Sequence, residues 1–261
     1  MGSPINAATD PTDGLRYYTF NDQRLVSVTS VRKVIGMPFA LAGWQVNQVI
    51  KASLALRGTA QGMTLPDDQY GKALRSMGMA ERDDAAKVGT SVHDAADAGV
   101  HSQDLSEDDV RRPFLAQYEA WQRAMDPEVL VSEAQVFSLK HGYAGSLDLI
   151  AEIKGHKYLV DLKTGKGVYT DHAVQLALYM GADFIGGFDP YEGMDAMFPE
   201  PTQHLMDCES MAVLHLRPDG WQFIEIPYSD ALAAASLDMV RLAHFFMDNP
   251  TIDTLKGATY P

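Results

Sequence analysis

Two aspartates and a lysine in the middle of the chain have the types and spacing for phosphodiester chemistry. Asp161 and Lys163 alternate within the apolar run 157–164, which is typical of a strand, so both side chains point to the same face. Asp148 lies thirteen residues before Asp161 on a second strand-like run, and a turn near Gly155 brings the two runs side by side. Carboxylates that converge on one sheet edge need a cation, and hard oxygen ligands favour Mg²⁺ or Mn²⁺. A lysine beside them can hold a water nucleophile or stabilise charge on a phosphate.

A histidine and a glutamate elsewhere in the chain can extend this site. His93 follows Gly89-Thr90-Ser91-Val92 near the start of a predicted helix, and Glu133 lies on the first predicted strand. Each residue also has an ordinary structural explanation. A lone histidine is more often structural than a ligand, Glu133 suits an exposed strand edge, and Asp161 with Lys163 suits a buried ion pair.

Two further pairs of residues lie close to these strands. Gln175 and Tyr179 are four residues apart on a predicted helix, so they share one face. Gly142 and Gly145 bracket the second strand, where a backbone can approach a ligand closely. The structural alternatives are a half-buried helix flank for the first pair and a turn or bulge for the second.

The hydrophobic periodicity predicts an α/β core with a central mixed sheet. Strands are predicted at 129–139, 143–153 and 157–164, and a later hairpin at 211–216 and 221–226. Helices are predicted at 171–180 and from Ser229, an N-cap, to about 247. The proline-containing segment 186–207 is either a loop over an active cleft or a plain surface insertion.

The first half of the chain is predicted to be mostly helical. One helix begins after Ser27 and ends at Gly36-Met37-Pro38, and others are predicted at 40–56, at 88–98 and from Ser106 onward. The last of these carries an apolar stripe that favours a core position over a base-stacking surface. The stripe consists of Phe114, Tyr118, Trp121 and Met125.

These elements divide the chain into four segments. We expect a flexible leader at 1–14, a helical region at 15–126 that contributes His93, a core at 127–250 and a tail at 251–261. The core and the helical region are expected to form one compact unit.

Composition narrows the class of protein. An apolar fraction of 46% permits a sizeable core. The sequence contains no run of eighteen or more apolar residues, so no membrane-spanning helix is expected. A single cysteine, Cys208, excludes an internal disulfide framework and a four-cysteine cluster, so the cytoplasm is the expected compartment. A net charge of −14 argues against a protein that coats nucleic acid, so any DNA path needs a local basic strip. The candidates for that strip are Lys72, Arg75, Arg82, Lys87, Arg111, Arg112, Lys163 and Lys166.

The ordered motifs resemble a known nuclease family. Between Gly89 and Tyr179 the chain carries G-T-S-V-H, then Glu133, then G-S-L-D, D-L-K-T-G and Q-L-A-L-Y. This series resembles the RecB-like branch of the PD-(D/E)XK nucleases, which includes the RecB and AddAB nuclease domains, the CRISPR-associated RecB-like exonucleases and many phage exonucleases. The resemblance implies a restriction-endonuclease-like core at 127–250.

The resemblance also implies a role for each metal-binding residue. His93 matches the histidine that binds a metal ion, and Asp148 matches the central aspartate that bridges the metal or metals. Asp161 matches the acidic ligand of the D-x-K motif, and the carbonyl of Leu162 matches a backbone ligand. Glu133 matches an acidic residue on the first core strand that contacts a second metal or a water.

The remaining matches concern catalysis and positioning. Lys163 resembles the catalytic lysine. Gln175 and Tyr179 resemble a pair that orients the lysine or contacts the DNA backbone. The implied reaction is attack of a metal-activated water on a phosphodiester with one or two Mg²⁺ or Mn²⁺ ions, giving a 5′-phosphate and a 3′-hydroxyl. The subtype with an iron–sulfur cluster is excluded because this chain lacks the four cysteines.

The biological setting follows only from the resemblance. It implies a DNA substrate and, among exonucleases of this kind, a role in recombination, repair or phage DNA processing in a bacterial or phage-infected cell. A recombination or single-strand annealing protein is the expected partner, and no membrane is expected. Exonuclease activity is favoured over endonuclease activity.

Three other functions fit parts of the sequence. A catalytically silent relative that binds DNA or a protein is disfavoured by the intact Asp148, Asp161 and Lys163. A nucleotide-binding phosphotransferase is rejected because Lys163-Thr164-Gly165-Lys166-Gly167 lacks the P-loop spacing. A zinc hydrolase using His93 with Asp94 and Asp97 lacks an H-E-x-x-H motif.

Overall fold

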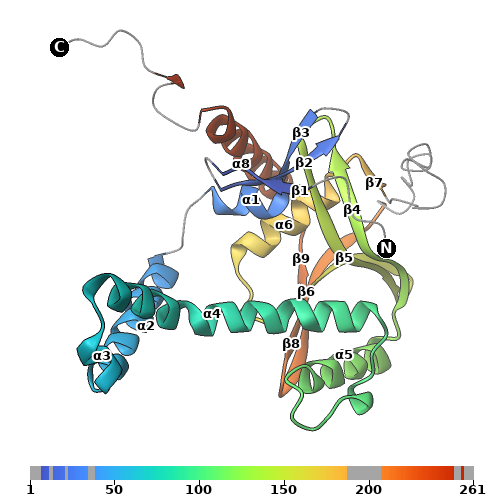
Figure 1. Cartoon of the computed structure of the whole chain (residues 1–261). Helices are drawn as coiled ribbons and strands as arrows, with labels where there is room; N and C mark the ends of the chain where they lie inside the picture. Colours follow the sequence, from blue (N-terminus) through green and yellow to red (C-terminus); the bar gives the residue numbers. More distant parts are fainter. Residues whose placement is uncertain are drawn as a thin grey trace, which may run out of the picture.

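A mixed β-sheet with helices on both faces forms the centre of the molecule (Figure 1). The computed structural model describes residues 7–11, 14–20, 23–34, 39–186, 207–249 and 254–255. Within these ranges the strands are β1 (Ala7–Thr9), β2 (Arg16–Phe20), β3 (Gln23–Ser27), β4 (Glu128–Ser138), β5 (Tyr143–Ile153), β6 (His156–Lys163), β7 (Phe184–Gly186), β8 (Ser210–Arg217) and β9 (Gly220–Ile226).

The helices fall before, between and after the strands of the core. They are α1 (Val28–Lys33), α2 (Phe39–Arg57), α3 (Ala60–Thr64), α4 (Asp67–Asp97), the short 3₁₀ helix η1 (Ser102–Asp104), α5 (Arg112–Met125), α6 (Thr170–Met180) and α8 (Asp230–Asp248). None of these described helices is both long enough and apolar enough to cross a membrane.

Strand β5 lies at the junction of the sheet. Along one edge it pairs with β4, antiparallel, over nearly its whole length. Along the other edge its start pairs in parallel with β3, at Val26–Tyr143 and Ser27–Ala144, and its end pairs antiparallel with β6. Strand β6 continues in parallel to β8, and the sheet ends with the β8–β9 hairpin. Because β3 and β6 share one edge of β5, the sheet forks in the middle of that strand.

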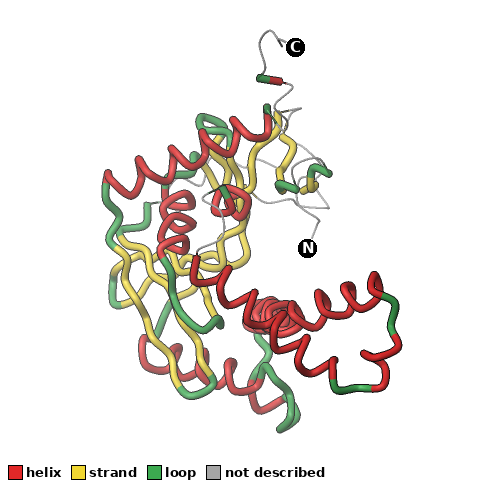
Figure 2. The backbone as a smooth tube through the Cα atoms, turned by 90° about the vertical axis from the view of Figure 1, so that its left-hand side faces the viewer, coloured by secondary structure: helices red, strands yellow, loops and turns green. Residues whose placement is uncertain are grey.

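Two apolar clusters fix the helices to opposite faces of the sheet. On one face, α1, α6 and α8 bury side chains such as Val31, Leu176 and Val240. On the other face, α5 and the C-terminal half of α4 bury Val92, Leu115 and Trp121. Figure 2 shows the strands between these two groups of helices. Burial of apolar surface at about 25 cal/mol per Å² is the main stabilising term for such layers.

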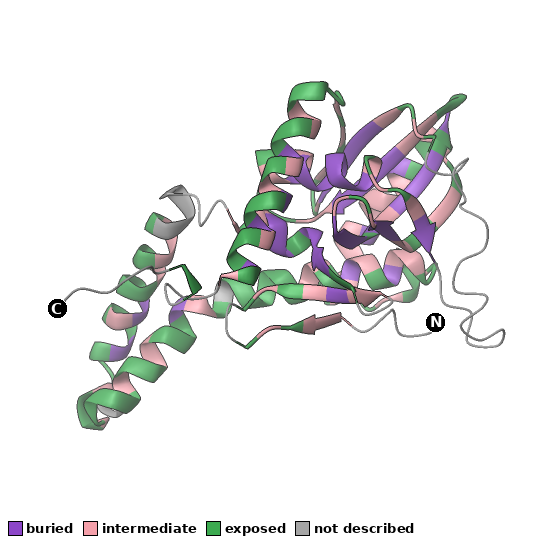
Figure 3. Cartoon of the chain, turned by 90° about the horizontal axis from the view of Figure 1, so that it is seen from above, coloured by how far each residue is buried: buried purple, intermediate pink, exposed green. Residues whose placement is uncertain are grey.

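Helix α4 is long enough to belong to both the core and an outer arm. Its C-terminal half packs on the sheet, whereas α2 packs against its N-terminal half and α3 packs against α2 (Figure 1). Seen from above, this arm projects from the body and is mostly exposed (Figure 3). His93 lies in the C-terminal half of this helix, so it is positioned at the edge of the core, whereas the N-terminal half extends into the exposed arm.

Most predicted elements of the core are confirmed. The predicted strands at 129–139, 143–153 and 157–164 correspond to β4, β5 and β6, and the predicted hairpin corresponds to β8 and β9. The helix at 171–180 is α6, and α8 begins after Ser229, whose side chain accepts a hydrogen bond from Leu232 N. The apolar stripe on α5 packs in the core, with Trp121 fully buried.

Two predictions for the first half are wrong, and a third is right in type but not in extent. Strands β1–β3 occupy segments predicted as a leader and a helical region, so the sheet begins before the helices. The segment predicted as a helix at 88–98 is helical, but it is the end of α4, which starts at Asp67. The helix expected from Ser106 begins instead at Arg112, because the Asp109 side chain accepts a hydrogen bond from Arg111 N and forms a turn. The predicted stop at Gly36-Met37-Pro38, nearly all of the segment 186–207, and the tail apart from Thr254 and Leu255 lie outside the described residues.

Candidate functional site

The fork between β5 and β6 positions Asp148. Pairing of these strands ends at Leu149–Val160, one residue short of Asp148 and Asp161. The Asp148 side chain then takes the place of the missing strand partner, because its Oδ2 accepts a hydrogen bond from Leu162 N at 2.6 Å. The second carboxylate oxygen of Asp148 faces His93 on α4, with its Oδ1 3.5 Å from Nδ1.

Three side chains from three elements form a candidate metal-binding group. His93, Glu133 and Asp148 each offer one ligand atom, and these atoms lie within 4.8 Å of one another. They come from α4, β4 and β5, so the group depends on the packing of α4 across the sheet. The predicted ligands His93 and Asp148 are therefore brought together, and Glu133 joins them.

Asp161 lies beside this group without belonging to it. Its side chain is fully buried, and its Oδ2 is 2.5 Å from Lys163 Nζ. That oxygen has no hydrogen bond of good geometry to any described residue. Lys163 Nζ also donates to the Leu162 carbonyl at 3.1 Å, so the carbonyl predicted as a backbone ligand contacts the lysine.

Gln175 and Tyr179 form a hydrogen-bonded network with Asp161, and neither of them hydrogen-bonds to Lys163 in the described structure. Gln175 Nε2 donates to Asp161 Oδ1 and to the Tyr179 hydroxyl, both at 3.0 Å. Both side chains are buried, at 8% and 3% exposed. The role expected for this pair, orienting the lysine or contacting the DNA backbone, stays a prediction. Gln175 is connected to Lys163 through Asp161, which both residues contact.

Sequence reasoning missed Arg32, which completes this network. From α1, Arg32 Nη1 donates to Gln175 Oε1, and its guanidinium also binds the Asp171 carboxylate. A donor at Oε1 fixes the orientation of the Gln175 amide, so that Nε2 faces Asp161. Arg32 and Gln175 are 143 residues apart, and no local pattern signals their contact.

The charges of the site are crowded. Glu133 is exposed at the surface, and partial desolvation of its carboxyl, together with the nearby Asp148 carboxylate, raises its pKa to about 7. Complete burial raises the pKa of Asp161 to about 6 despite the Lys163 ammonium. For Asp148, burial opposes ionisation, but His93, Lys163 and the Leu162 N–H outweigh it and lower the pKa. For His93, burial is outweighed by contact with Asp148, which raises the pKa.

The donor set fits a divalent cation. Crowded carboxylates and a buried carboxylate oxygen without a good hydrogen bond are the features that a cation would relieve. Carboxylate ligands suit Mg²⁺ and Mn²⁺, and an imidazole ligand suits first-row transition metals. His93, Glu133 and Asp148 would hold the ion, and the Asp161 carboxylate lies close enough to interact with that of Asp148.

The backbone of Glu133 is also unusual. Its φ is +47°, in the left-handed region that side chains other than glycine rarely adopt. The regular pairing of β4 with β5 includes Ser132–Leu149 and Ala134–Leu147 on either side of it. Strain of this kind is found at functional sites, where the surrounding structure imposes it.

The glycines serve close packing and a turn. A Cβ at Gly145 would lie 2.6 Å from Tyr179 Cε1, so this glycine lets the Tyr179 ring rest on β5. Gly142 has a φ of +74° and occurs in a turn. The Gly145 backbone is thus approached closely by the Tyr179 ring, where a ligand was predicted. Gly142 lies in a turn, which was the structural alternative for this pair.

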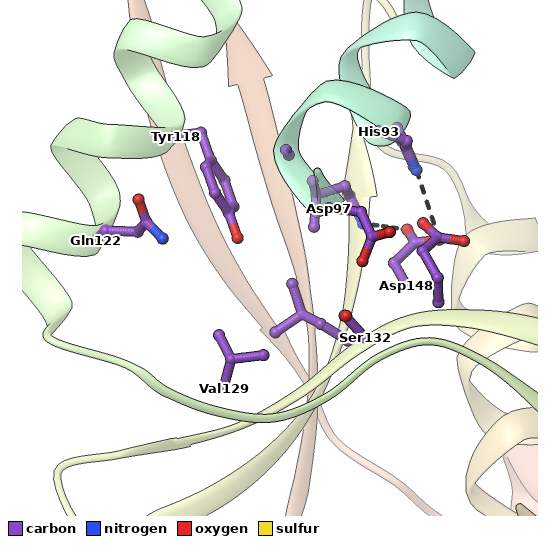
Figure 4. Close-up of a pocket in the computed structure, with 11 residues that line it drawn as sticks. His93, Asp97, Tyr118, Gln122, Val129, Ser132 and Asp148 are labelled. Carbon is purple, nitrogen blue, oxygen red and sulfur yellow. Dashed lines mark hydrogen bonds and ion pairs between the residues drawn. The ribbon is translucent and has the colours of Figure 1, made fainter. Parts of the chain in front are cut away.

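Two hollows meet at the candidate metal-binding group. The Lys163 hollow, about 450 Å³, is bounded by Gly89 and Thr90 of α4 and by Lys163 to Gly165. The α5 hollow, about 200 Å³, is bounded by Tyr118 and Gln122 of α5, Asp97 of α4 and Ser132 of β4 (Figure 4). His93, Glu133 and Asp148 line both hollows, so they form the wall between them.

Away from the site itself, four of the eight cations of the predicted basic strip form ion pairs with acidic neighbours. Lys72 pairs with Asp68, Arg82 with Asp83, Lys87 with Asp84 and Arg111 with Asp109. These partners are close in sequence and partly neutralise the strip. Lys163 is the strip residue that lies at the site itself.

Comparisons with known proteins add little to this geometry. No protein-family model matches the sequence, and the comparison with curated proteins gives no match. Among solved structures, the crystal structure of SSO0001 aligns with 17% identity and a TM-score of 0.31, over 52% of this chain and 58% of that chain. A similarity of this size carries no argument, so function has to be inferred from the site.

Proposed function

We propose that this chain is a metal-dependent nuclease that hydrolyses phosphodiester bonds in DNA, with exonuclease action favoured. One observation carries the proposal. The His93–Glu133–Asp148 group lies beside the ion pair of the buried Asp161 with Lys163, at a fork in the sheet that opens into a hollow. The same residues are those that resemble the RecB-like nucleases, and the mixed sheet with helices on both faces is compatible with a nuclease core of that family.

A bound Mg²⁺ or Mn²⁺ would polarise the phosphate and lower the pKa of a water. Around it, the residues of the chain have separate tasks. Asp148, whose pKa is lowered, supplies a carboxylate held by Leu162 N–H. Lys163 Nζ lies at the border of the Lys163 hollow, where it can donate to a phosphate oxygen.

The network behind the site would hold these groups still. Arg32 fixes Gln175, and Gln175 with Lys163 holds Asp161. In the reaction, the water oxygen bonds to phosphorus as the bond from phosphorus to the 3′ oxygen breaks. The proton lost by the water balances the one gained by the leaving oxygen, giving a 5′-phosphate and a 3′-hydroxyl as the resemblance implies.

Degradation of end-labelled DNA tests the proposal. Linear and closed circular DNA, single- and double-stranded, are incubated with Mg²⁺, Mn²⁺ or EDTA and the parent protein, Asp161→Asn or Lys163→Met. We expect metal-dependent loss of linear DNA by the parent and a rate at least about 100-fold lower in both variants. Sparing of circles would establish an exonuclease.

The contrary result is equally clear. If the folded parent cleaves none of these substrates with either metal, the nuclease proposal fails. A catalytically silent module that binds DNA or a protein then becomes the better account, and DNA affinity is the quantity to measure.

A further inference from the structure

The α5 hollow lies on the opposite side of the candidate metal-binding group from Lys163. It shares His93, Glu133 and Asp148 with the Lys163 hollow, and its floor is formed by Leu149 and Leu162. The metal-binding group would therefore lie between a phosphate held near Lys163 and the α5 hollow. A part of the substrate joined to that phosphate by one sugar could reach the hollow.

Besides the candidate metal-binding group, four polar side chains line the hollow, and two of them, Gln122 and Ser132, are exposed. Tyr118, Gln122, Asp97 and Ser132 contribute a hydroxyl, an amide, a carboxylate and a second hydroxyl. In the described part of the chain, no side chain makes a hydrogen bond with any of these four groups. Donors and acceptors thus converge from three elements on one small space (Figure 4).

Tyr118 gives the hollow an aromatic wall. Its ring extends from α5 toward Asp97 and Ser132 (Figure 4). The fully buried Trp121 supports it, with ring centroids 5.4 Å apart. The stripe on α5 is therefore divided: Trp121 belongs to the core, and Tyr118 also borders the hollow. Base–aromatic stacking is the usual way in which proteins hold an unpaired base.

Charge and size decide what can occupy the hollow. Asp97, Glu133 and Asp148 border it, and no described lysine or arginine lines it, whereas the Lys163 hollow has Lys163 beside its carboxylates. A phosphate therefore suits the Lys163 hollow, and a neutral ring with amino groups would find acceptors in the α5 hollow. Its volume of about 200 Å³ lies below the roughly 300–1,000 Å³ of sites for drug-sized ligands. A single ring system fits this volume better than a whole nucleotide.

We infer that the α5 hollow is a subsite for one nucleobase of the DNA, next to the cleaved phosphate and turned out of the base stack. This inference rests on the proposed nuclease function. Tyr118 would stack on the base, and Asp97, Gln122 and Ser132 would bind its edge. The subsite would favour single-stranded or frayed ends, where a base is already free to turn outward.

Base removal in the substrate tests the subsite with the unaltered protein. Single-stranded oligonucleotides carry one abasic residue at successive positions, and kcat/KM for cleavage at a fixed phosphate is measured with Mn²⁺. We expect a loss of about 10-fold at one of the two nucleotides that flank the cleaved phosphate. Equal rates at every abasic position, with the parent cleaving intact DNA, would overturn the subsite and leave the nuclease proposal standing.

Substitutions at Tyr118 test whether the loss of kcat/KM on the sensitive abasic substrate comes from stacking on its ring. Tyr118→Leu removes the ring, Tyr118→Phe keeps it, and Phe114→Leu makes the same kind of change on α5 outside the hollow. We expect about a 10-fold loss for Tyr118→Leu on intact DNA, no further loss on the sensitive abasic substrate, and near-parental rates for the other two. An equal loss for Tyr118→Leu on intact and abasic DNA would assign the ring a purely structural role and contradict the inference. If the folded parent cleaves no DNA at all, the proposed function and this subsite fail together.

Discussion

Glu133 combines an unfavourable backbone with an unfavourable charge. Its φ of +47° places a side chain where glycine is preferred, and its neighbours raise the pKa of its carboxyl to about 7. Left-handed backbone costs non-glycine residues roughly 1–2 kcal/mol. A residue that costs stability in two ways at a cluster of ligand atoms is best explained by its use in that cluster.

Glu133→Gly separates the two effects. Glycine suits the backbone and removes the crowded carboxylate, so in EDTA the free energy of unfolding should equal that of the parent or exceed it by up to about 1 kcal/mol. The rise in Tm that Mn²⁺ gives the parent should be lost. Thermal unfolding with EDTA and with Mn²⁺ measures both. A glycine variant that is clearly less stable in EDTA, yet keeps the full Mn²⁺ effect, would contradict this role.

His172 is a second residue whose charge bears on stability. Burial, helped by the Lys163 charge, lowers its pKa from 6.5 to about 4. Its Nδ1 accepts a hydrogen bond from Tyr169 N at 3.1 Å at the start of α6, a bond that protonation of Nδ1 removes. Because the unfolded chain takes up this proton more readily, the stability that His172 contributes is present above pH 6.5 and is lost as the pH falls toward 4.

His172→Gln should remove this pH dependence. Glutamine at the same helix position keeps a side-chain acceptor for Tyr169 N but does not titrate. The difference in unfolding free energy between parent and variant should therefore shift against the parent between pH 6.5 and about 4. Taking the difference cancels the opposite contributions of Glu133 and Asp161, whose pKa values are raised. A difference that stays constant with pH, measured by denaturant unfolding, would refute the explanation.

At the scale of elements, the site depends on close contact between α6 and β5. Gly145 allows the Tyr179 ring to lie against the strand, and Tyr179 accepts the Gln175 hydrogen bond. A methyl group at position 145 would be 2.6 Å from the ring and 3.2 Å from Val28 Cβ. Both neighbours are fully or nearly buried and have little room to move.

Gly145→Ala should therefore destabilise the protein by about 1–3 kcal/mol. Gly71→Ala is the matched control, because Gly71 lies on the exposed part of α4 with nothing within 4 Å of its added methyl. Alanine is the better helix former, so the control should gain up to about 1 kcal/mol. Denaturant unfolding of both variants checks the two signs, and a neutral Gly145→Ala would show that the contact is looser than the structure indicates.

The elements that carry local patterns could be predicted from the sequence, and the others could not. Strands β4, β5 and β6 carry local strand patterns, so their bounds could be predicted to within one residue. Strands β1–β3 are short, and β3 reaches the sheet only by pairing with Tyr143 and Ala144, more than a hundred residues later. The continuity of α4 was hidden by its polar outer segment, which packs on α2 and not on the sheet.

The same distinction applies to the site. Asp148, Asp161 and Lys163 could be predicted because strand alternation and a tight turn are local properties. The fork that makes Asp148 bind Leu162 N, the Arg32 contact to Gln175 and the α5 hollow all depend on long-range packing. Spacing alone could not show that Asp161 is held by Gln175 and Lys163 outside the group formed by His93, Glu133 and Asp148.

At the scale of the whole molecule, charge limits how the chain can bind DNA. The net charge is −14, and several cations of α4 are paired with acidic neighbours. Proteins with about 6–10 phosphate contacts lose roughly 10³–10⁵ in affinity between about 50 and 200 mM salt. We expect a loss below about 10² for this chain with Ca²⁺ present, and weaker binding in EDTA. Fluorescence anisotropy with labelled DNA measures both. Tight, steeply salt-dependent binding in EDTA would contradict this expectation and indicate an extended basic surface for DNA.

The most direct test of the central claim compares three proteins on one labelled linear DNA with Mn²⁺ and with EDTA. They are the parent, Asp148→Asn, and Glu152→Gln as a control on the exposed part of the same strand. We expect the parent and Glu152→Gln to cleave with Mn²⁺ and not with EDTA, and Asp148→Asn to be slower by at least about 100-fold. Cleavage by Asp148→Asn at the parental rate, or by the parent in EDTA, would contradict the claim that this site is a metal-dependent nuclease.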